Sequence, residues 1–240
     1  MRLLIDDILT IAPLKCGTRS IRLYTALAKN KIICDKYEKE KLVKGFSVKD
    51  FLEDTSLGFK IKDYVSRYKQ DGYGIQNSDY TRVKCYNEKY NILLTPEDFI
   101  DYDSGVTKPK IRIAFVRDPV KRFLSAYNMI CKNFLGVYPM QKFINNFSQL
   151  MWEHTYYREH FKYQTCELGL NPQWYTLILD INDMNEFKKI LENNCKYPLP
   201  VVHINKTSHG LNYEELTSEQ IDWVKEKYAI DYNTYGEWFK

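Results

Sequence analysis

The chain has 240 residues, of which 44% are hydrophobic and 28% are charged, and its formal net charge is +4. This length and composition fit one compact globular domain over residues 1–240 and exclude disordered and fibrous classes. The small positive charge does not indicate a nucleic-acid partner, although an excess of cations suits a small polyanionic ligand.

The first predicted unit is a strand, a loop and a helix. Residues 8–12 form a short apolar run, ILTIA, which ends at Pro13 and indicates a buried strand. Residues 18–29 follow with the pattern of a helix. The loop between them therefore joins the end of a strand to the start of a helix.

This loop reads PLKCGTRS over residues 13–20, and its position predicts an anion-binding site. Backbone N–H groups at a helix start have no partner within the helix, and the helix dipole is positive there. Gly17 allows the backbone to approach a ligand closely, and Lys15 adds a full positive charge. Thr18 and Ser20 contribute hydroxyl donors. An ordinary capped helix after a glycine turn is the alternative.

Nucleotide kinases have a related loop with the pattern GxxxxGK[ST], in which the lysine follows the second glycine. Here Lys15 precedes Gly17, and no earlier glycine occurs in the loop. A small-molecule kinase that uses ATP and magnesium is therefore disfavoured. It remains an alternative interpretation, as does a nucleotide-binding relative without catalytic activity.

The middle of the chain contains several weak strand signals and one strong one. Short apolar runs at residues 32–34, 83–86 and 91–94 indicate further strands. The run IRIAFV at residues 111–116 is a much clearer strand.

A helix is predicted directly after residues 111–116. Asp118 is a favoured N-cap residue, and Pro119 is favoured at the first helical position. Arg117 is placed at the carboxyl end of the strand, where open α/β sheets bind ligands. Ser125 lies seven residues after Asp118, about two helical turns, so these residues share a helix face. Arg117 and Ser125 can then converge on one phosphate, and a structural ion pair between Arg117 and Asp118 is the alternative.

Strands and helices continue to alternate toward the C-terminus. Four more segments are predicted, alternately helical and extended, at residues 139–151, 174–179, 183–194 and 201–204. The last helix begins near Thr217, where Gln220 completes a capping box, and it ends at about Tyr228. This alternation predicts an α/β fold with a central parallel sheet covered by helices. Two anion motifs on different strands of such a fold suit a ligand with two separated phosphates.

The cysteines and the N-terminus add no further site. The six cysteines are scattered singly without a CxxC pair, so we expect free thiols and no metal site. The sequence contains no run of the ~18 apolar residues that a membrane helix requires, and no secretion signal or anchor is visible. A cytoplasmic location is expected if the chain is full length.

The two anion motifs together resemble those of sulfotransferases that use 3′-phosphoadenosine 5′-phosphosulfate (PAPS). PLKCGTRS at residues 13–20 is similar to the 5′-phosphosulfate loop of this family. FVRDPVKRFLSAY at residues 115–127 is similar to its 3′-phosphate motif. Three further segments resemble the Golgi-type carbohydrate branch of the family: EHFKYQ (159–164), LPVVHINKT (199–207) and YAIDY (228–232).

The resemblance implies a P-loop-like fold with three layers, α/β/α, and transfer of a sulfuryl group from PAPS to a hydroxyl group by in-line displacement. Lys15 is implied to stabilise the negative charge that grows on the oxygen between sulfur and phosphorus. The 5′ sulfated phosphate is implied to bind to the loop residues Lys15, Cys16, Gly17, Thr18, Arg19 and Ser20. Arg117 and Ser125 are implied to hold the 3′ phosphate, without a metal. Lys206 and Thr207 are implied to close over the nucleotide.

A general base that takes the proton from the acceptor hydroxyl is expected to be a histidine or a buried glutamate. Several relatives carry this base between the two phosphate motifs, whereas all four histidines of this chain follow Arg117. His160 is the first candidate, because it lies beside Glu159 in the EHFKYQ segment. Glu38 is the main alternative and Glu153 is a third. A packed or surface role for His160 is the competing interpretation.

The acceptor is expected to be a glycan or a small molecule that carries a hydroxyl group, because of the resemblance to the carbohydrate branch. Lys162, Arg158 and nearby tyrosines are candidates for binding it. No nucleic-acid partner is expected.

Overall fold

The protein is built around a four-stranded sheet with the strand order β1-β2-β3-β4. The computed structural model describes residues 2–5, 7–44, 51, 110–202 and 210–240. The strands are β1 (Arg2–Ile5), β2 (Ile8–Ile11), β3 (Ile111–Val116) and β4 (Leu177–Asp180). The strands β2, β3 and β4 are parallel, whereas β1 pairs with β2 in the antiparallel direction. The predicted α/β class with a parallel sheet is confirmed.

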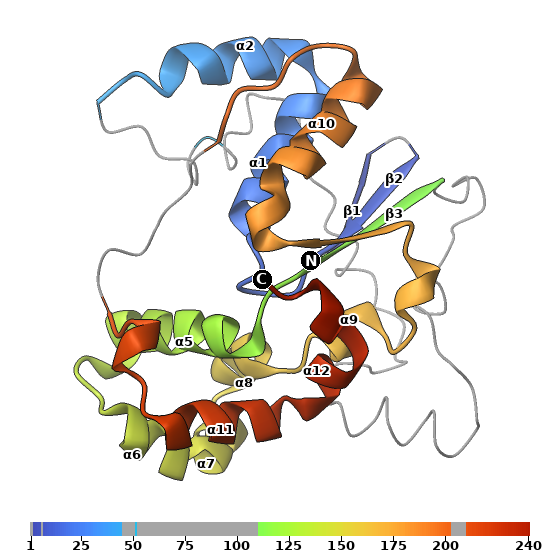
Figure 1. Cartoon of the computed structure of the whole chain (residues 1–240). Coiled ribbons are helices and arrows are strands. Elements are labelled where there is room, and N and C mark those ends of the chain that lie inside the picture. Colours follow the sequence, from blue (N-terminus) through green and yellow to red (C-terminus); the bar gives the residue numbers. More distant parts are fainter. Residues whose placement is uncertain (1, 6, 45–50, 52–109, 203–209) are drawn as a thin grey trace.

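Helices cover both faces of the sheet (Figure 1). One face packs against α1 (Thr18–Lys29) and α10 (Met184–Cys195), and α2 (Lys31–Glu40) packs on α1. The other face packs against α9 (Thr165–Leu168), α12 (Ala229–Tyr235) and a 3-10 turn at Pro172–Trp174. This is the predicted three-layer α/β/α arrangement.

A second group of helices lies beyond the carboxyl end of β3, in the lower half of Figure 1. Its members are α5 (Pro119–Ile130), α6 (Met140–Asn145), α7 (Phe147–Glu153), α8 (Thr155–Phe161) and α11 (Ser218–Lys227). A π-helical turn, η4 (Cys131–Leu135), follows α5, and short 3-10 turns occur at Ile181–Asp183, Tyr213–Glu215 and Gly236–Trp238. These five helices share a separate apolar core around the rings of Phe123 and Phe143.

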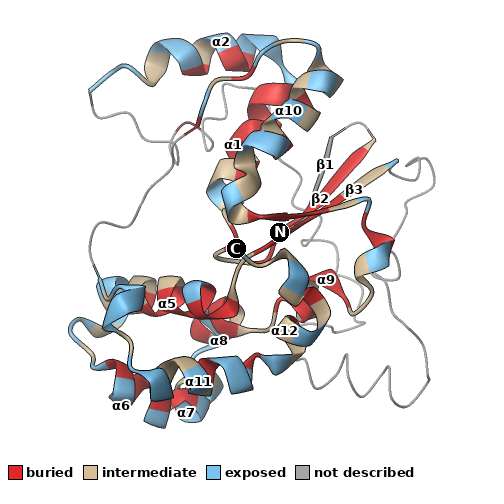
Figure 2. Ribbon diagram, viewed as in Figure 1, coloured by how far each residue is buried: buried red, intermediate tan, exposed pale blue. Residues whose placement is uncertain are grey.

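Alternate side chains of β3 pack on opposite faces of the sheet, and all of them are buried at its carboxyl end. Ile113 and Phe115 belong to the core under α1 and α10, whereas Ala114 and Val116 belong to the core under α9 and α12. Figure 2 shows both central strands, β2 and β3, largely buried. A strand that is buried on both faces reads as a continuous apolar run, and this is why these strands are evident from the sequence.

Both predicted side-chain caps are confirmed. The Asp118 side chain accepts a hydrogen bond from the N–H of Lys121 at 2.9 Å, and Pro119 occupies the first turn of α5. Thr217 and Gln220 form the predicted capping box of α11, in which each side chain accepts from the backbone N–H of the other residue.

The prediction of a strand at residues 32–34 is wrong, because this segment belongs to α2. The Asn30 side chain caps the helix by accepting a hydrogen bond from the N–H of Ile32 at 2.8 Å. Ile33, Cys34 and Tyr37 form the buried face of the helix. The apolar run alone is too short to distinguish a strand from a helix. Tyr37 adds a third apolar residue at helical spacing, and this spacing favours the helix.

Other segments differ from the predictions in their boundaries. The hairpin strand β1 was not predicted. Residues 139–151 form two helices with a break at Asn146, and the extended segment predicted from residue 174 becomes a strand only at Leu177.

Some predictions fall on parts of the chain that the structure does not describe. The predicted strands at residues 83–86 and 91–94 lie outside the described residues, as does half of 201–204. The single domain over residues 1–240 stays a prediction. Among the described helices, none has the length and apolar character needed to cross a membrane.

Candidate functional site

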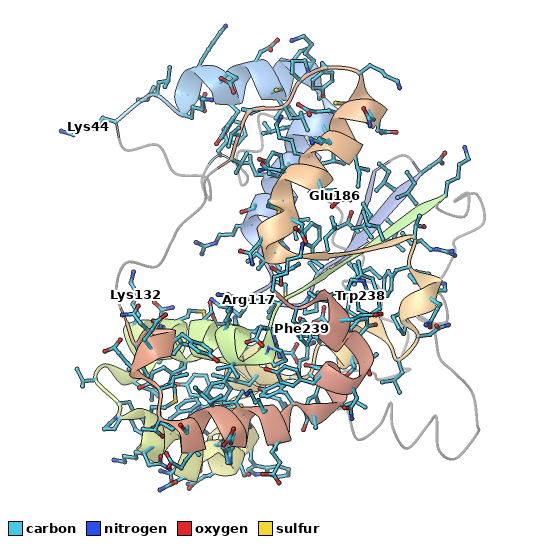
Figure 3. All side chains as sticks on the ribbon, viewed as in Figure 1. Lys44, Arg117, Lys132, Glu186, Trp238 and Phe239 are labelled. Atoms are coloured by element: carbon cyan, nitrogen blue, oxygen red, sulfur yellow. The ribbon has the colours of Figure 1, made fainter. Side chains whose placement is uncertain are left out.

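The two predicted anion motifs meet at one edge of the sheet. Because β2 and β3 are parallel neighbours, their carboxyl ends lie side by side. The guanidinium of Arg117, which follows β3, donates a hydrogen bond from Nη1 to the backbone oxygen of Lys15 at 3.1 Å. Figure 3 shows Arg117 between the start of α5 and the start of α1. The structure therefore brings residues 15 and 117 together, although they are 102 positions apart in the sequence.

The loop after β2 reaches α1 through two residues with positive φ. The φ of Lys15 is 69°, which is uncommon for a non-glycine residue and typical of functional sites, and the φ of Gly17 is 72°. Gly17 is the N-cap of α1, no side chain caps this helix start, and no acidic residue occupies its first turn. The first backbone N–H groups and the positive end of the helix dipole are therefore available to an anion without a competing side chain of the helix start.

The loop depends on the absence of a side chain at residue 17. A Cβ atom there would lie 2.9 Å from Cε of Met184 and 3.2 Å from Cγ1 of Ile181. We expect Gly17→Ala to lower the free energy of unfolding by about 2 kcal/mol or more, since a left-handed backbone alone costs about 1–2 kcal/mol. Chemical denaturation measures this loss.

Gly136 allows a comparison in which packing plays no part. Its φ is 63°, its ψ is −140°, and an added Cβ would meet nothing within 4 Å. Gly136→Ala should therefore show only the conformational cost of that backbone, which differs from the left-handed helical backbone of Gly17. An unchanged free energy of unfolding in Gly17→Ala would mean that the loop tolerates a side chain at residue 17.

Three cations gather at the loop: Lys15, Arg19 and Arg117. Burial lowers the pKa of Lys15 to about 8, and the charges of Arg117 and Arg19 contribute to the lowering. Among the described residues, no carboxylate lies within ion-pair distance of these three side chains. Uncompensated positive charge at a helix start fits an anionic ligand.

Asp118 has a structural role that leaves Arg117 available. Its Oδ1 accepts from the N–H of Lys121, and its Oδ2 accepts from the hydroxyl of Tyr232 at 2.8 Å. The alternative of an Arg117–Asp118 ion pair is not observed in the described part of the chain. Ser125 is half-buried on α5.

Cys16 supports the loop from the inside. Its Sγ is buried and donates to Oε1 of Gln164 at 3.2 Å, while its backbone N–H donates to the oxygen of Pro13 at 3.2 Å. Burial raises the pKa of the Cys16 thiol to about 12. Both donors of Cys16 are therefore used within the protein, and the ligand contacts expected of this residue are not available in this conformation.

A residue that the sequence analysis missed, Arg122, joins the loop to the segment after α8. Its side chain is 2% exposed and donates to the backbone oxygens of Leu14 and His160, each at 3.3 Å, and to that of Lys162. The guanidinium also lies over the ring of Tyr228, 5.6 Å from its centre. An arginine on the apolar, inward face of α5 was the signal in the sequence, because arginine is almost never fully buried without partners.

His160 lies beside the loop and is 8% exposed. Its Nδ1 is 2.8 Å from the backbone oxygen of Tyr156. A carbonyl oxygen only accepts hydrogen bonds, so Nδ1 carries the proton and Nε2 of the neutral ring keeps its lone pair. Burial lowers the pKa of His160, and the nearby charge of Lys15 lowers it further. The ring is therefore neutral at pH 7 and able to accept a proton at Nε2.

The other candidate bases lie elsewhere. Glu38 is exposed on α2 and pairs with Lys41 at 2.7 Å. This helix follows the C-terminal end of α1, whereas Lys15 precedes its N-terminal end, and Figure 1 shows α2 at the far end of α1. A helix of 12 residues spans about 18 Å, so the structure does not bring Glu38 to the loop. Glu153 is exposed and accepts from Gln149 at 2.8 Å.

The remaining candidates are either paired or not described. Lys162 forms ion pairs at 2.8 Å with both Glu159 and Glu167, which neutralise its charge. Lys206 and Thr207 lie outside the described residues. Within the described ranges, no three His, Cys, Asp or Glu side chains gather in a way that could hold a metal ion.

Comparison with known proteins gives a family match. A family model described as "Sulfotransferase family" matches residues 50–236 of the chain. The match includes the motif around Arg117 and begins after the loop at residues 13–20, so the assignment of the loop depends on its geometry. No curated protein and no solved structure matches the chain.

Proposed function

The chain belongs to the sulfotransferase family, and we propose that it transfers a sulfuryl group from PAPS to a hydroxyl group of a carbohydrate. The hydrogen bond between Arg117 and Lys15 is the observation that carries this proposal, because it places two cationic motifs at neighbouring strand ends. PAPS has an anionic group at each end of its ribose, at the 5′ and 3′ positions. Two adjacent cationic motifs are suited to such a ligand.

In this proposal each motif holds one end of the nucleotide. The start of α1 and the side chain of Lys15 bind the 5′ end, with Thr18, Arg19 and Ser20 as further donors. Arg117 and Ser125 bind the 3′ phosphate. PAPS supplies an activated sulfuryl group when it is bound. Lys15 stabilises the negative charge that develops on the leaving phosphate, because a buried cation interacts strongly with charge in a site that excludes water.

His160 is the proposed general base. Its Nε2 would accept the proton of the acceptor hydroxyl as the oxygen attacks sulfur. The hydrogen bond from Nδ1 to the oxygen of Tyr156 holds the tautomer that this step requires. Burial lowers the pKa of His160, and the charge of Lys15 in the loop lowers it further, so the neutral ring that this step requires is favoured.

A carbohydrate acceptor is supported by aromatic rings next to His160. The ring of Tyr156 lies 4.4 Å from that of His160 and 5.3 Å from that of Phe134. Phe134 is 57% exposed and Tyr156 is 47% exposed, so both rings present apolar surface to the solvent. Exposed aromatic rings can pack against the C–H face of a sugar ring. Phe134 also lies on the π-helical turn η4, a conformation that is frequent at functional sites.

These two groups predict a bell-shaped pH profile for kcat/KM of the donor. Activity should fall on the acid side, below pH 6.5, as His160 becomes protonated, because its pKa is lowered from 6.5. Activity should also fall above about pH 8, as Lys15 loses its charge in the free enzyme. In kcat the alkaline limb should move to higher pH, because a bound anion favours the protonated amine.

His160→Gln tests the acid limb. The variant should lose the pH dependence below neutral pH and keep the alkaline limb. An unchanged acid limb would place the general base elsewhere in the chain.

Transfer of radiolabelled sulfate from PAPS to a panel of glycans, phenols and peptides tests the function as a whole. We expect a glycan to be labelled. Calorimetry with adenosine 3′,5′-bisphosphate and with ATP plus magnesium accompanies it. Binding of ATP with magnesium in place of the bisphosphate would indicate a kinase, and bisphosphate binding without transfer to any acceptor would indicate an inactive relative.

A further inference from the structure

One buried side chain, that of Gln164, contacts both anion motifs. Its Oε1 accepts from the backbone N–H of Arg117 at 3.0 Å and from Sγ of Cys16 at 3.2 Å. Its Nε2 donates to the backbone oxygen of Arg117 at 2.8 Å. Gln164 is completely buried, so water does not compete for these bonds.

The pair of bonds to Arg117 constrains the direction of the guanidinium. The carboxamide of Gln164 donates and accepts on the same residue, as a neighbouring strand does in a sheet, and so holds the backbone of Arg117 just after β3 ends. The hydrogen bond from Cys16 to Gln164 fixes the loop as well, because Cys16 lies between Lys15 and Gly17. One side chain thus sets the relative position of the two motifs.

Gln164 is itself held by the C-terminal region. The carboxylate of Asp231, which is completely buried, accepts from the backbone N–H of Gln164 at 2.9 Å and from that of Thr165 at 3.0 Å. Tyr228 donates from its hydroxyl to the oxygen of Phe161 at 2.5 Å. These hydrogen bonds therefore join the segments EHFKYQ and YAIDY behind the two anion motifs. The bonds are made within the protein and do not involve the ligand.

We propose that Gln164 is a positioning residue that sets the separation of the two anion motifs, so that a nucleotide with both a 5′ and a 3′ phosphate is recognised as one unit. This inference depends on the proposed function, since it assumes that each motif binds one end of the donor. Gln164 acts through Lys15, Gly17 and Arg117. Replacing Gln164 should therefore reduce the gain in affinity that comes from binding both phosphates at once. It should have a smaller effect on the affinity for a ligand with one phosphate.

Calorimetry with three ligands measures this cooperation directly. The ligands are adenosine 3′,5′-bisphosphate, adenosine 5′-monophosphate and adenosine 3′-monophosphate. We expect Gln164→Leu to reduce the preference for the bisphosphate over either monophosphate by about 10-fold or more, because a misplaced second contact loses about 1.4 kcal/mol. The affinities for the monophosphates should change by less than about threefold.

Three further variants separate positioning from loss of folding. Gln164→Glu keeps an acceptor for Arg117 and Cys16 and, when ionised, lacks the donor, so its preference should lie between wild type and Gln164→Leu. Cys16→Ala removes only the bond from the loop, and it should reduce the preference by a smaller amount, whereas Cys16→Ser keeps a donor and should restore most of it. The Cys16 pair decides the question if Gln164→Leu does not fold.

The outcomes distinguish this inference from the proposed function. A uniform loss of affinity for all three ligands, or an unchanged preference in a folded Gln164→Leu and in Cys16→Ala, would overturn the positioning role. A wild-type protein that shows no preference for the bisphosphate would instead overturn the proposed function itself.

Discussion

Lys15→Ala is expected to reduce turnover by about 100- to 1,000-fold, which is close to complete loss of activity. Lys15 is the cation that the fold places beside both Arg117 and the start of α1. The Lys15 amine is buried close to the charges of Arg117 and Arg19, which lowers its pKa to about 8 and would strengthen its interaction with a bound anion. The measurement is kcat for sulfate transfer at saturating PAPS.

Lys39→Ala is a suitable control, because Lys39 is exposed on α2, which lies at the far end of α1 from the loop (Figure 1). It should retain wild-type turnover. Circular dichroism would show that both variants are folded. Activity near the wild-type level in Lys15→Ala would refute the role of the loop.

Arg117→Ala is expected to raise the Kd for adenosine 3′,5′-bisphosphate by about 30-fold or more, equivalent to about 2 kcal/mol. In the proposed function Arg117 supplies a forked donor for the 3′ phosphate, so truncation would leave that phosphate without its charged partner. The affinity for adenosine 5′-monophosphate should fall much less. Titration calorimetry with both ligands provides the comparison.

Arg117→Lys tests whether charge or geometry matters. The lysine keeps the positive charge and lacks the planar fork, so its Kd for the bisphosphate should lie between wild type and Arg117→Ala. If Arg117→Ala weakens both ligands equally, then Arg117 acts on the loop through its bond to Lys15 and does not bind the 3′ phosphate.

Much of the fold follows from local signals. The strands β2 and β3 are apolar runs that end at a proline or before an N-cap residue. The predicted helix over residues 18–29 coincides with α1. The run at residues 32–34 is too short to distinguish a strand from a helix, and Tyr37 completes the helical face that is buried. The break between α6 and α7 at Asn146 was not predicted.

The candidate site was also only partly predictable from the sequence. The positions of Lys15 and Arg117 were predictable, because the ends of parallel strands meet at one edge of the sheet. The roles of Arg122 and Gln164 were not, although both residues lie inside segments that resemble the family. An arginine on the inward face of α5 was a signal for Arg122, but it did not identify the partners, which are backbone oxygens. Gln164 bonds to the backbone of Arg117 and to Sγ of Cys16, and no pattern in the sequence identifies these partners.

The sequence by itself determined two cationic motifs, each at the start of a helix, because helix caps, the helix dipole and buried strands are set by neighbouring residues. Only the tertiary structure decided how those motifs are held together. Gln164 reaches Cys16 across 148 positions and Arg117 across 47 positions of the chain. Such contacts exist only once the whole chain has packed, because burial gives these hydrogen bonds their strength and the path of the backbone gives them their partners.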